Sequence, residues 1–290
     1  MSHTEPYPRV SEDLHSLLCS AGRSRLFAGC DEQERVERLA GLLGEERCRQ
    51  LGVFALPAGF RLSVVMPCYN EAATVDESLR RVCCCGIPLE VLAVDDGSTD
   101  GTREILARWQ ERPMDDDVIL RVLSHPTNQG KGAALKTGFL AATGDVVLVQ
   151  DADLEYDPAD YWRLIRPIVD GEADVVFGSR FGGSRREEPY LGHALANRLL
   201  TWISNRFTGL RLSDMETCYK VFRRDVIARI APELRERRFG VEPELTARLA
   251  RLPGVRVQER PIGYAGRQYS EGKKIGWRDG FRALYCIVRY

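Results

Sequence analysis

The sequence lacks any long apolar run, and no stretch approaches the ~18 uninterrupted apolar residues that a membrane-spanning helix requires. The first residues, Ser2 to Pro6, lack the basic-then-apolar order of a signal peptide. Nine cysteines, three of them consecutive at Cys83–Cys85, fit neither a disulfide framework nor the spacing of zinc ligands. We therefore expect a cytoplasmic protein whose cysteines are small buried residues in a reducing compartment.

The chain also has almost no net charge, −1 at pH 7, which gives no indication of a nucleic-acid partner. The balance is uneven along the chain, however. Residues 1–177 carry 18 Lys and Arg against 30 Asp and Glu, whereas residues 178–290 carry 23 against 12. The basic part is suited to an anionic partner or surface.

From residue 61 onward, apolar strands alternate with helical patterns. This alternation predicts βαβ units and an α/β fold, with a mostly parallel, Rossmann-like sheet and helices on both faces. Strands are expected at 62–66, 89–94, 118–123, 145–150, 174–177 and 219–222. Helices are expected at 74–82, 101–110, 132–142, 161–169, 195–207 and 243–250.

Three domains are expected. Residues 1–59 form a helical extension without a chemical motif, and residues 60–275 form the α/β domain. Residues 276–290 form an amphipathic helix, because apolar residues recur at helical spacing among Lys and Arg. This pattern is typical of an interfacial membrane element, and packing of the same face onto the protein's own core is the alternative.

Each of the first four expected strands is followed by a polar cluster, at 67–71, 95–100, 128–132 and 151–153. One such cluster is ordinary turn chemistry. In a parallel sheet, however, all four carboxyl ends meet at the edge where ligands bind. The four clusters together therefore predict a ligand site.

The residue types indicate what this site binds. Asp151 and Asp153 supply hard oxygen ligands that suit Mg²⁺ or Mn²⁺, ions that usually hold a substrate's phosphates as well. Asp95 and Asp96 can accept hydrogen bonds from a nucleobase or a ribose. Lys131 lies among glycines at an expected helix start, which favours an anion. The segment is not a Walker A loop, and no G-x-G-x-x-G follows the first strand.

Four segments carry a resemblance to a known family: 64–71, 94–102, 128–138 and 151–153. They resemble the family 2 glycosyltransferases of GT-A fold, and the resemblance extends from about residue 61 to at least residue 275. It implies that Asp151 and Asp153 hold a divalent cation, which bridges the donor diphosphate. It also implies nucleotide-sugar binding by Pro67, Tyr69, Glu71 and Asp96.

Within the family, the chain is most similar to the polyprenyl-phosphate sugar synthases, the dolichyl-phosphate mannose synthase group. The residues that carry this similarity are 151–158, 178–181, 214–224 and 266–274. It implies that Arg180 binds the acceptor phosphate, with Asn197 and Arg198 as weaker candidates. It also implies that Arg267 and Lys273 or Lys274 close over the diphosphate.

Two positions depart from the pattern of that group. Glu155 stands where relatives often have Gln, and its carboxylate could join the metal shell. The segment Asp214–Lys220 departs from the usual Ser/Cys-Gly-Phe-Arg/Lys pattern, which weakens the assignment of acceptor and sugar more than that of fold.

The expected activity is a metal-dependent, inverting transfer of a hexose from a UDP- or GDP-sugar to a polyprenyl phosphate, at the inner face of an anionic membrane. A lipid phosphate is already ionised at neutral pH, so this reaction needs no strong general base. A hydroxyl acceptor needs one, and Asp214, Glu216 and Glu242 are the candidates. A non-catalytic protein that keeps the nucleotide pocket is a third interpretation.

Overall fold

The computed structural model describes residues 38–39, 41–44, 55–181, 191–266 and 277–290. The chain divides into two compact units, Met1–Ala58 and Gly59–Tyr290. Most of the expected extension at 1–59 lies outside the described residues, and its role stays a prediction. Every element discussed below belongs to the second unit.

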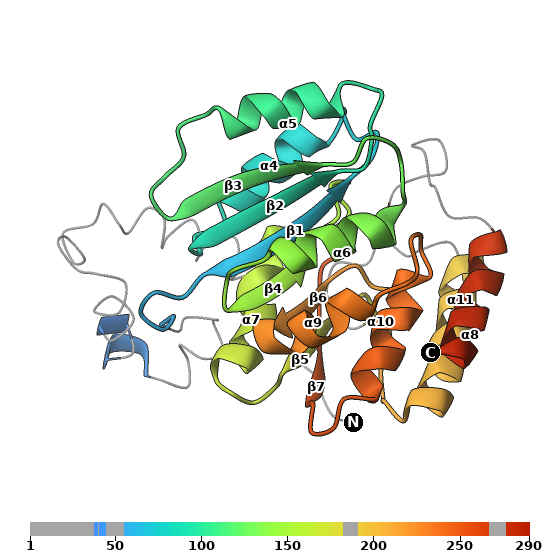
Figure 1. Cartoon of the computed structure of the whole chain (residues 1–290). Coiled ribbons are helices and arrows are strands. Elements are labelled where there is room, and N and C mark those ends of the chain that lie inside the picture. Colours follow the sequence, from blue (N-terminus) through green and yellow to red (C-terminus); the bar gives the residue numbers. More distant parts are fainter. Residues whose placement is uncertain (1–37, 40, 45–54, 182–190, 267–276) are drawn as a thin grey trace. The chain divides into compact units, whose positions relative to one another are not determined.

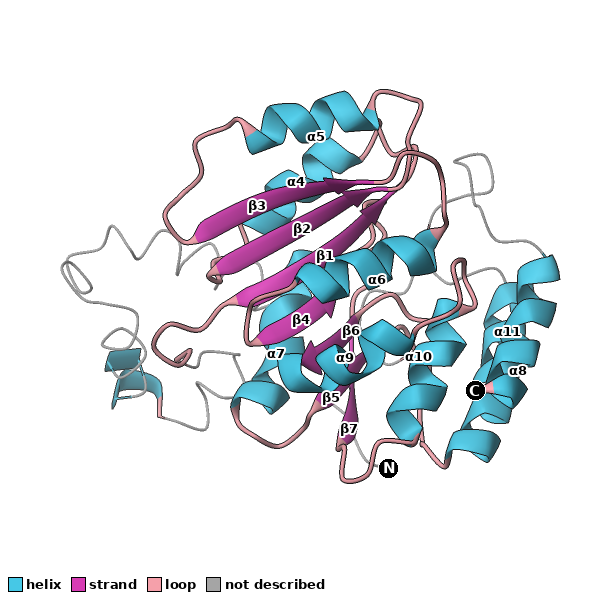
Figure 2. Ribbon diagram, in the orientation of Figure 1, coloured by secondary structure: helices cyan, strands magenta, loops and turns pink. Residues whose placement is uncertain are grey.

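The second unit is built on a seven-stranded sheet with the order β3-β2-β1-β4-β6-β5-β7 (Figure 1, Figure 2). Only β6 runs antiparallel to its neighbours, so the predicted α/β fold with a mostly parallel sheet is confirmed. The strands are β1 (Leu62–Cys68), β2 (Leu89–Asp95), β3 (Val118–Ser124), β4 (Val146–Val149), β5 (Val175–Ser179), β6 (Lys220–Arg223) and β7 (Val257–Pro261).

Helices flank this sheet. α6 crosses in front of β1 in Figure 1, and its contact is close: a Cβ on Gly138 would lie 2.3 Å from Cγ1 of Val65. The helices are α4 (Val75–Cys83), α5 (Thr102–Gln110), α6 (Lys131–Ala141), α7 (Tyr161–Val169), α8 (Leu191–Thr208), α9 (Arg224–Ile230), α10 (Val241–Ala250) and α11 (Trp277–Arg289). α8, α10 and α11 lie side by side at the right of Figure 1, beside the half of the sheet that includes β6, β5 and β7.

The strand register aligns the carboxyl ends of the first four strands. Cys68 pairs with Asp95, and Asp95 pairs with Ser124 on its other side. Val65 of β1 pairs with Val149, the last residue of β4. The loops that leave β1, β2, β3 and β4 therefore start at one edge of the sheet. The central strands β1, β2 and β4 are almost wholly buried, so close packing holds the starts of these loops rigidly.

Candidate functional site

Lys131 and Asp151 come from different loops and meet at this edge. The Lys131 Nζ atom lies 2.9 Å from Oδ1 of Asp151 and 3.4 Å from Oε1 of Glu242, the second residue of α10. Burial alone raises the pKa of the Asp151 carboxyl, but the Lys131 ammonium outweighs it and holds that pKa below its usual value. Asp151 is therefore ionised at neutral pH and already bound to a cation.

Asp153 and Glu155 follow Asp151 in a sharply turned loop. Leu154 between them adopts a left-handed backbone conformation with φ of 64°, which bulky residues rarely adopt. That turn lets the backbone N–H of Glu155 donate to Oδ1 of Asp153 at 3.2 Å. The strained backbone of Leu154 thus keeps the carboxylates of Asp153 and Glu155 on one tight turn.

Asp96 is buried and accepts hydrogen bonds from the loop that presents Lys131. The backbone N–H groups of Gln129 and Gly130 donate to it at 2.9 and 2.6 Å, and Nδ1 of His125 lies 2.6 Å from its Oδ1. Asp95 is also buried and accepts from Nε of Arg103 at 2.9 Å. Both carboxylates therefore organise neighbouring loops, a role that the sequence did not indicate.

Pro67, Tyr69 and Glu71 lie at the end of β1 and in the loop that follows it, and all three are half-buried. The backbone N–H of Glu71 donates to Oγ1 of Thr102 at 2.9 Å, and its carboxylate accepts from Oγ1 of Thr74 at 2.9 Å. Their loop is tied in this way to the start of α5, the helix after β2. The two segments expected to bind the nucleotide are adjacent.

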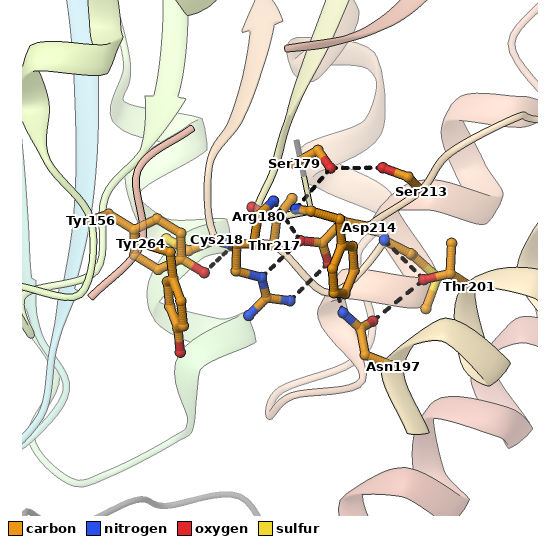
Figure 3. A network of polar contacts seen from close by, with 12 residues as sticks. Tyr156, Ser179, Arg180, Asn197, Thr201, Ser213, Asp214, Thr217, Cys218 and Tyr264 are labelled. Atoms are coloured by element: carbon orange, nitrogen blue, oxygen red, sulfur yellow. Dashed lines mark hydrogen bonds and ion pairs between the residues drawn. The ribbon is translucent and has the colours of Figure 1, made fainter. Parts of the chain in front are cut away.

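A second group of polar residues lies where β5 ends (Figure 3). Arg180 binds the wholly buried Asp214 in a bidentate fashion, through Nε at 2.7 Å and Nη2 at 2.8 Å. Asn197 on α8 donates to the same carboxylate at 2.8 Å. Burial alone would raise the pKa of Asp214, but the Arg180 guanidinium holds it below its usual value. Arg198 is not part of this cluster: it is exposed, and its guanidinium lies over the ring of Phe181.

Tyr264 connects the two groups, and sequence reasoning missed it. The Arg180 guanidinium lies 5.3 Å from the centre of the Tyr264 ring, beside which Tyr156 packs (Figure 3). The Tyr264 hydroxyl donates to Oε2 of Glu155 at 3.1 Å. Its position directly before the segment 266–274, which carries part of the family pattern, was the signal available in the sequence.

The other expected residues of the site fall outside this description. Arg267, Lys273 and Lys274 lie outside the described residues, so their expected closure over the diphosphate stays a prediction.

The carboxylates at this edge suit a metal ion whose coordination shell is completed by the substrate. Within the described part of the chain, no three carboxylate, imidazole or thiol groups converge closely enough to hold a metal by themselves. Mg²⁺ usually takes one or two protein carboxylates and fills its shell with water and substrate phosphates. The carboxylates of Asp151 and Asp153 fit such a site, and Glu155 is close by along the chain.

Residues 63–231 match the family model for glycosyl transferase family 2. The undecaprenyl-phosphate mannosyltransferase of Micrococcus luteus is 30% identical over 240 residues, which cover 79% of this chain and 93% of that protein. The undecaprenyl-phosphate 4-deoxy-4-formamido-L-arabinose transferase of Salmonella paratyphi A is 29% identical over 217 residues. That match covers 73% of this chain and 62% of the Salmonella protein.

Solved structures support the fold. Glucosyl-3-phosphoglycerate synthase from Mycobacterium tuberculosis, in complex with phosphoglyceric acid, superposes with a TM-score of 0.58 at 22% identity, over 80% of each chain. The same synthase in complex with Mn²⁺, uridine diphosphate and phosphoglyceric acid gives a TM-score of 0.57, also at 22% identity. This match covers 80% of this chain and 78% of that one.

Proposed function

The chain belongs to glycosyl transferase family 2, and from that membership we propose that it moves a hexose from a nucleoside-diphosphate sugar to a polyprenyl phosphate. The reaction is an inverting, divalent-metal-dependent transfer. Two relatives are named for transfer to undecaprenyl phosphate, and both match over more than two thirds of this chain. Family membership also favours an enzyme over a nucleotide-binding scaffold.

The observation that carries the proposal is the cluster of Arg180, Asp214 and Asn197. Asp214 takes up two of the five N–H donors of the guanidinium and fixes its plane, while the remaining donors can bind a phosphate. A phosphate monoester is ionised at neutral pH, so it needs a positioned cation rather than a base. Arg180 supplies that cation from the end of β5.

The donor side requires stabilisation of negative charge. As the acceptor oxygen bonds to the anomeric carbon, the bond from that carbon to the diphosphate breaks and the nucleoside diphosphate gains charge. Lys131 lies at the amino end of α6, and its ammonium can turn from Asp151 to a bound phosphate. Asp151 and Asp153 would hold the Mg²⁺ or Mn²⁺, which supplies Lewis-acid stabilisation of the same leaving group.

The acceptor would be reached at a membrane surface. Within the described residues, no helix is both long and apolar enough to cross a bilayer. α8 nevertheless exposes large apolar side chains at helical spacing: Leu195, Leu199 and Trp202 are 70%, 55% and 66% exposed. On the adjacent α11, Tyr285 and Val288 are 50% and 60% exposed. We call this set of side chains the α8–α11 face.

The two helices of the α8–α11 face also carry exposed positive charge. Arg198 and Arg206 on α8 are exposed, as are Arg282 and Arg289 on α11. A face of large apolar side chains bordered by arginines is typical of helices that lie in the interface of an anionic bilayer. Because the inward side of α8 carries Asn197, such contact would bring the Arg180 cluster near the membrane surface.

A hydroxyl acceptor is the second candidate, and one observation favours it. Asp214 and Glu242 are already paired with cations, but burial raises the pKa of Glu216 to about 7. A carboxyl with that pKa can accept a proton at neutral pH. Glu216 is therefore the strongest of the three candidate bases.

The test incubates the full chain with labelled UDP- and GDP-hexoses, Mg²⁺ or Mn²⁺, and extracted bacterial lipid. We expect label in the lipid fraction, and at least about 100-fold slower transfer for Asp153→Ala. Asp116→Ala, which removes an exposed carboxyl before β3, is the control and keeps wild-type rates. Unchanged turnover of Asp153→Ala would refute the metal site, and label confined to a water-soluble product would favour the hydroxyl acceptor.

A further inference from the structure

A buried chain of charges extends from the donor site into the protein. The Lys220 side chain on β6 is wholly buried, and its Nζ atom donates to the backbone carbonyl of Thr217 and to Oε2 of Glu242. Oε1 of Glu242 faces Lys131, which binds Asp151. The buried carboxylate of Glu242 is therefore linked through one lysine to the loop that holds the expected metal ligands.

Two side-chain oxygens in this region have neither a hydrogen-bond donor nor a cation. Among the described residues, the buried side-chain oxygens without a hydrogen bond are Oε1 of Glu216, Oγ1 of Thr217 and Oε1 of Glu242. Of these, Oε1 of Glu242 lies 3.4 Å from the Lys131 ammonium, whereas Thr217 is 0% exposed and has no such partner. Buried acceptors are nearly always paired, because an unpaired one loses its hydrogen bonds to water without compensation. The oxygens of Glu216 and Thr217 therefore indicate a ligand that brings donors.

Structural packing does not account for Glu216. The residue is half-buried, and its carboxyl, with a buried Oε1, lies among four charged groups: Glu242 on α10, Lys220 on β6, Arg180 after β5, and Asp214 in its own loop. Burial and the Glu242 charge both raise the pKa of Glu216. An apolar residue of similar size would be better tolerated by the fold at such a place. A carboxyl at this place therefore points to binding.

The position of these oxygens suggests what they bind. Glu242 contacts Lys131, which binds Asp151, where a donor diphosphate would be held. Glu216 lies near Arg180 and Asp214, where an acceptor phosphate would be held. In a transfer between the two, the migrating sugar must lie between them. Its hydroxyl groups are the donors that the unpaired oxygens lack.

We propose that Glu216 and Glu242 form the subsite that binds the hydroxyl groups of the transferred sugar. The inference rests on the proposed function and adds the chemistry of the substrate: a neutral sugar with free hydroxyls. Where Glu216 is ionised, a hexuronic acid is disfavoured, because its carboxylate would face that of Glu216. This assignment makes Glu216 a specificity-determining residue rather than a base. It also falls in Asp214–Lys220, the segment that departs from the family pattern.

Calorimetric titration of the full chain, in the presence of Mg²⁺, separates sugar binding from a structural role and from the role of a base. The titrated ligands are UDP, GDP and their glucose and mannose conjugates. Glu216→Leu should weaken binding of the preferred nucleotide sugar at least about tenfold and leave binding of the bare nucleoside diphosphate unchanged. Glu216→Gln, which keeps an acceptor oxygen, should recover most of that loss. Glu104→Gln, at an exposed position on α5, is the matched control and should bind both ligands like the wild type.

A second arm uses UDP-glucuronate and UDP-glucose. At about pH 8, where the Glu216 carboxyl is ionised, the preference of the wild type for the neutral sugar should shrink at least about fivefold in Glu216→Leu, because the repelling carboxylate is gone. Equal loss of nucleotide and nucleotide-sugar binding would overturn the inference, since it indicates a structural role. Unchanged binding with slower transfer would overturn it in favour of a base. A wild-type chain that binds none of these ligands would overturn the proposed function itself.

Discussion

Glu216 gives the protein a measurable pH dependence. Its pKa is raised from 4.5 to about 7, so between these values the folded chain keeps a proton that the unfolded chain loses. The stability that this group contributes is therefore fully present below pH 4.5, and it is lost as the pH rises through about 7. The loss is on the order of 3 kcal/mol, since one pKa unit corresponds to about 1.4 kcal/mol.

Glu216→Gln cannot ionise and should escape this loss. We expect the free energy of unfolding of the variant, relative to the wild type, to rise between about pH 4.5 and about pH 8. Urea denaturation across that range measures the difference. Glu104→Gln, which removes one exposed negative charge, is the control for the loss of a charge as such. Curves for Glu216→Gln and the wild type that stay parallel would show that Glu216 is not held in its protonated form.

At the scale of residues, the sequence predicted the types of site side chains better than their partners. The sequence placed Asp151 and Lys131 at one sheet edge, but it did not predict the ion pair between them. It also did not predict the hydrogen bonds of Asp96 to Gln129 and Gly130, because residue type alone does not reveal which acceptors neighbouring loops already use. Likewise, Asp214 was weighed as a base, whereas in the structure it fixes Arg180, a residue 34 positions away.

At the scale of elements, the start of α6 depends on a close backbone contact. A Cβ on Gly132 would lie 2.1 Å from the carbonyl oxygen of Glu236, and one on Gly130 would lie 2.3 Å from that of Arg237. The backbone N–H of Ala133 donates to the same Arg237 carbonyl at 3.1 Å. The segment before α10 therefore holds the loop that carries Lys131.

Gly132→Ala should force these two segments apart. We expect a loss of about 1–3 kcal/mol in the free energy of unfolding, because neither backbone can yield cheaply. We also expect weaker binding of nucleoside diphosphate, because Lys131 moves with the loop. Denaturation and calorimetry measure the two effects. Gly280→Ala in α11 is the control: its Cβ meets nothing within 4 Å, and the change should stabilise the protein by about 0.5–1 kcal/mol. Similar behaviour of both variants would contradict the contact.

The strands of the first half were predictable because each is a short, largely apolar run, wholly or almost wholly buried in β1, β2 and β4 and half-buried in the edge strand β3. The second half was harder to read. β7 was missed because Val257–Pro261 is a half-buried edge strand with charged residues, which carries no apolar signal. α9 was missed because it spans only Arg224–Ile230. The antiparallel direction of β6 arises from long-range pairing with β4 and β5, which local periodicity does not encode.

At the scale of the whole molecule, charge is divided along the chain. Residues 178–290, which include α8 and α11, hold 23 Lys and Arg against 12 Asp and Glu, although the net charge of the chain is −1. The attraction of the protein to an anionic surface therefore depends on its orientation, because the acidic part, residues 1–177, is repelled by such a surface. This division favours the α8–α11 face as the side turned toward a membrane.

Vesicles of phosphatidylglycerol and phosphatidylcholine test that orientation. We expect co-sedimentation that weakens as salt rises, because part of the attraction is electrostatic. The double variant Leu199→Gln/Trp202→Gln should bind at least about tenfold more weakly, since it removes two large apolar side chains. Ile119→Gln replaces a side chain that is 44% exposed on β3, at the opposite edge of the sheet, and should bind normally. Equal binding of all three proteins would rule out the α8–α11 face.

The contact between Glu236 and α11 has an evolutionary consequence. The Glu236 carboxylate accepts from Arg282 at 2.7 Å and from the Tyr290 hydroxyl at 3.2 Å, while its backbone carbonyl lies against Gly132. One residue thus joins a helix at the protein surface to the loop of the donor lysine. We therefore expect that, among descendants of this chain, substitutions on α11 that alter the contact with Glu236 are accompanied by changes around Gly132.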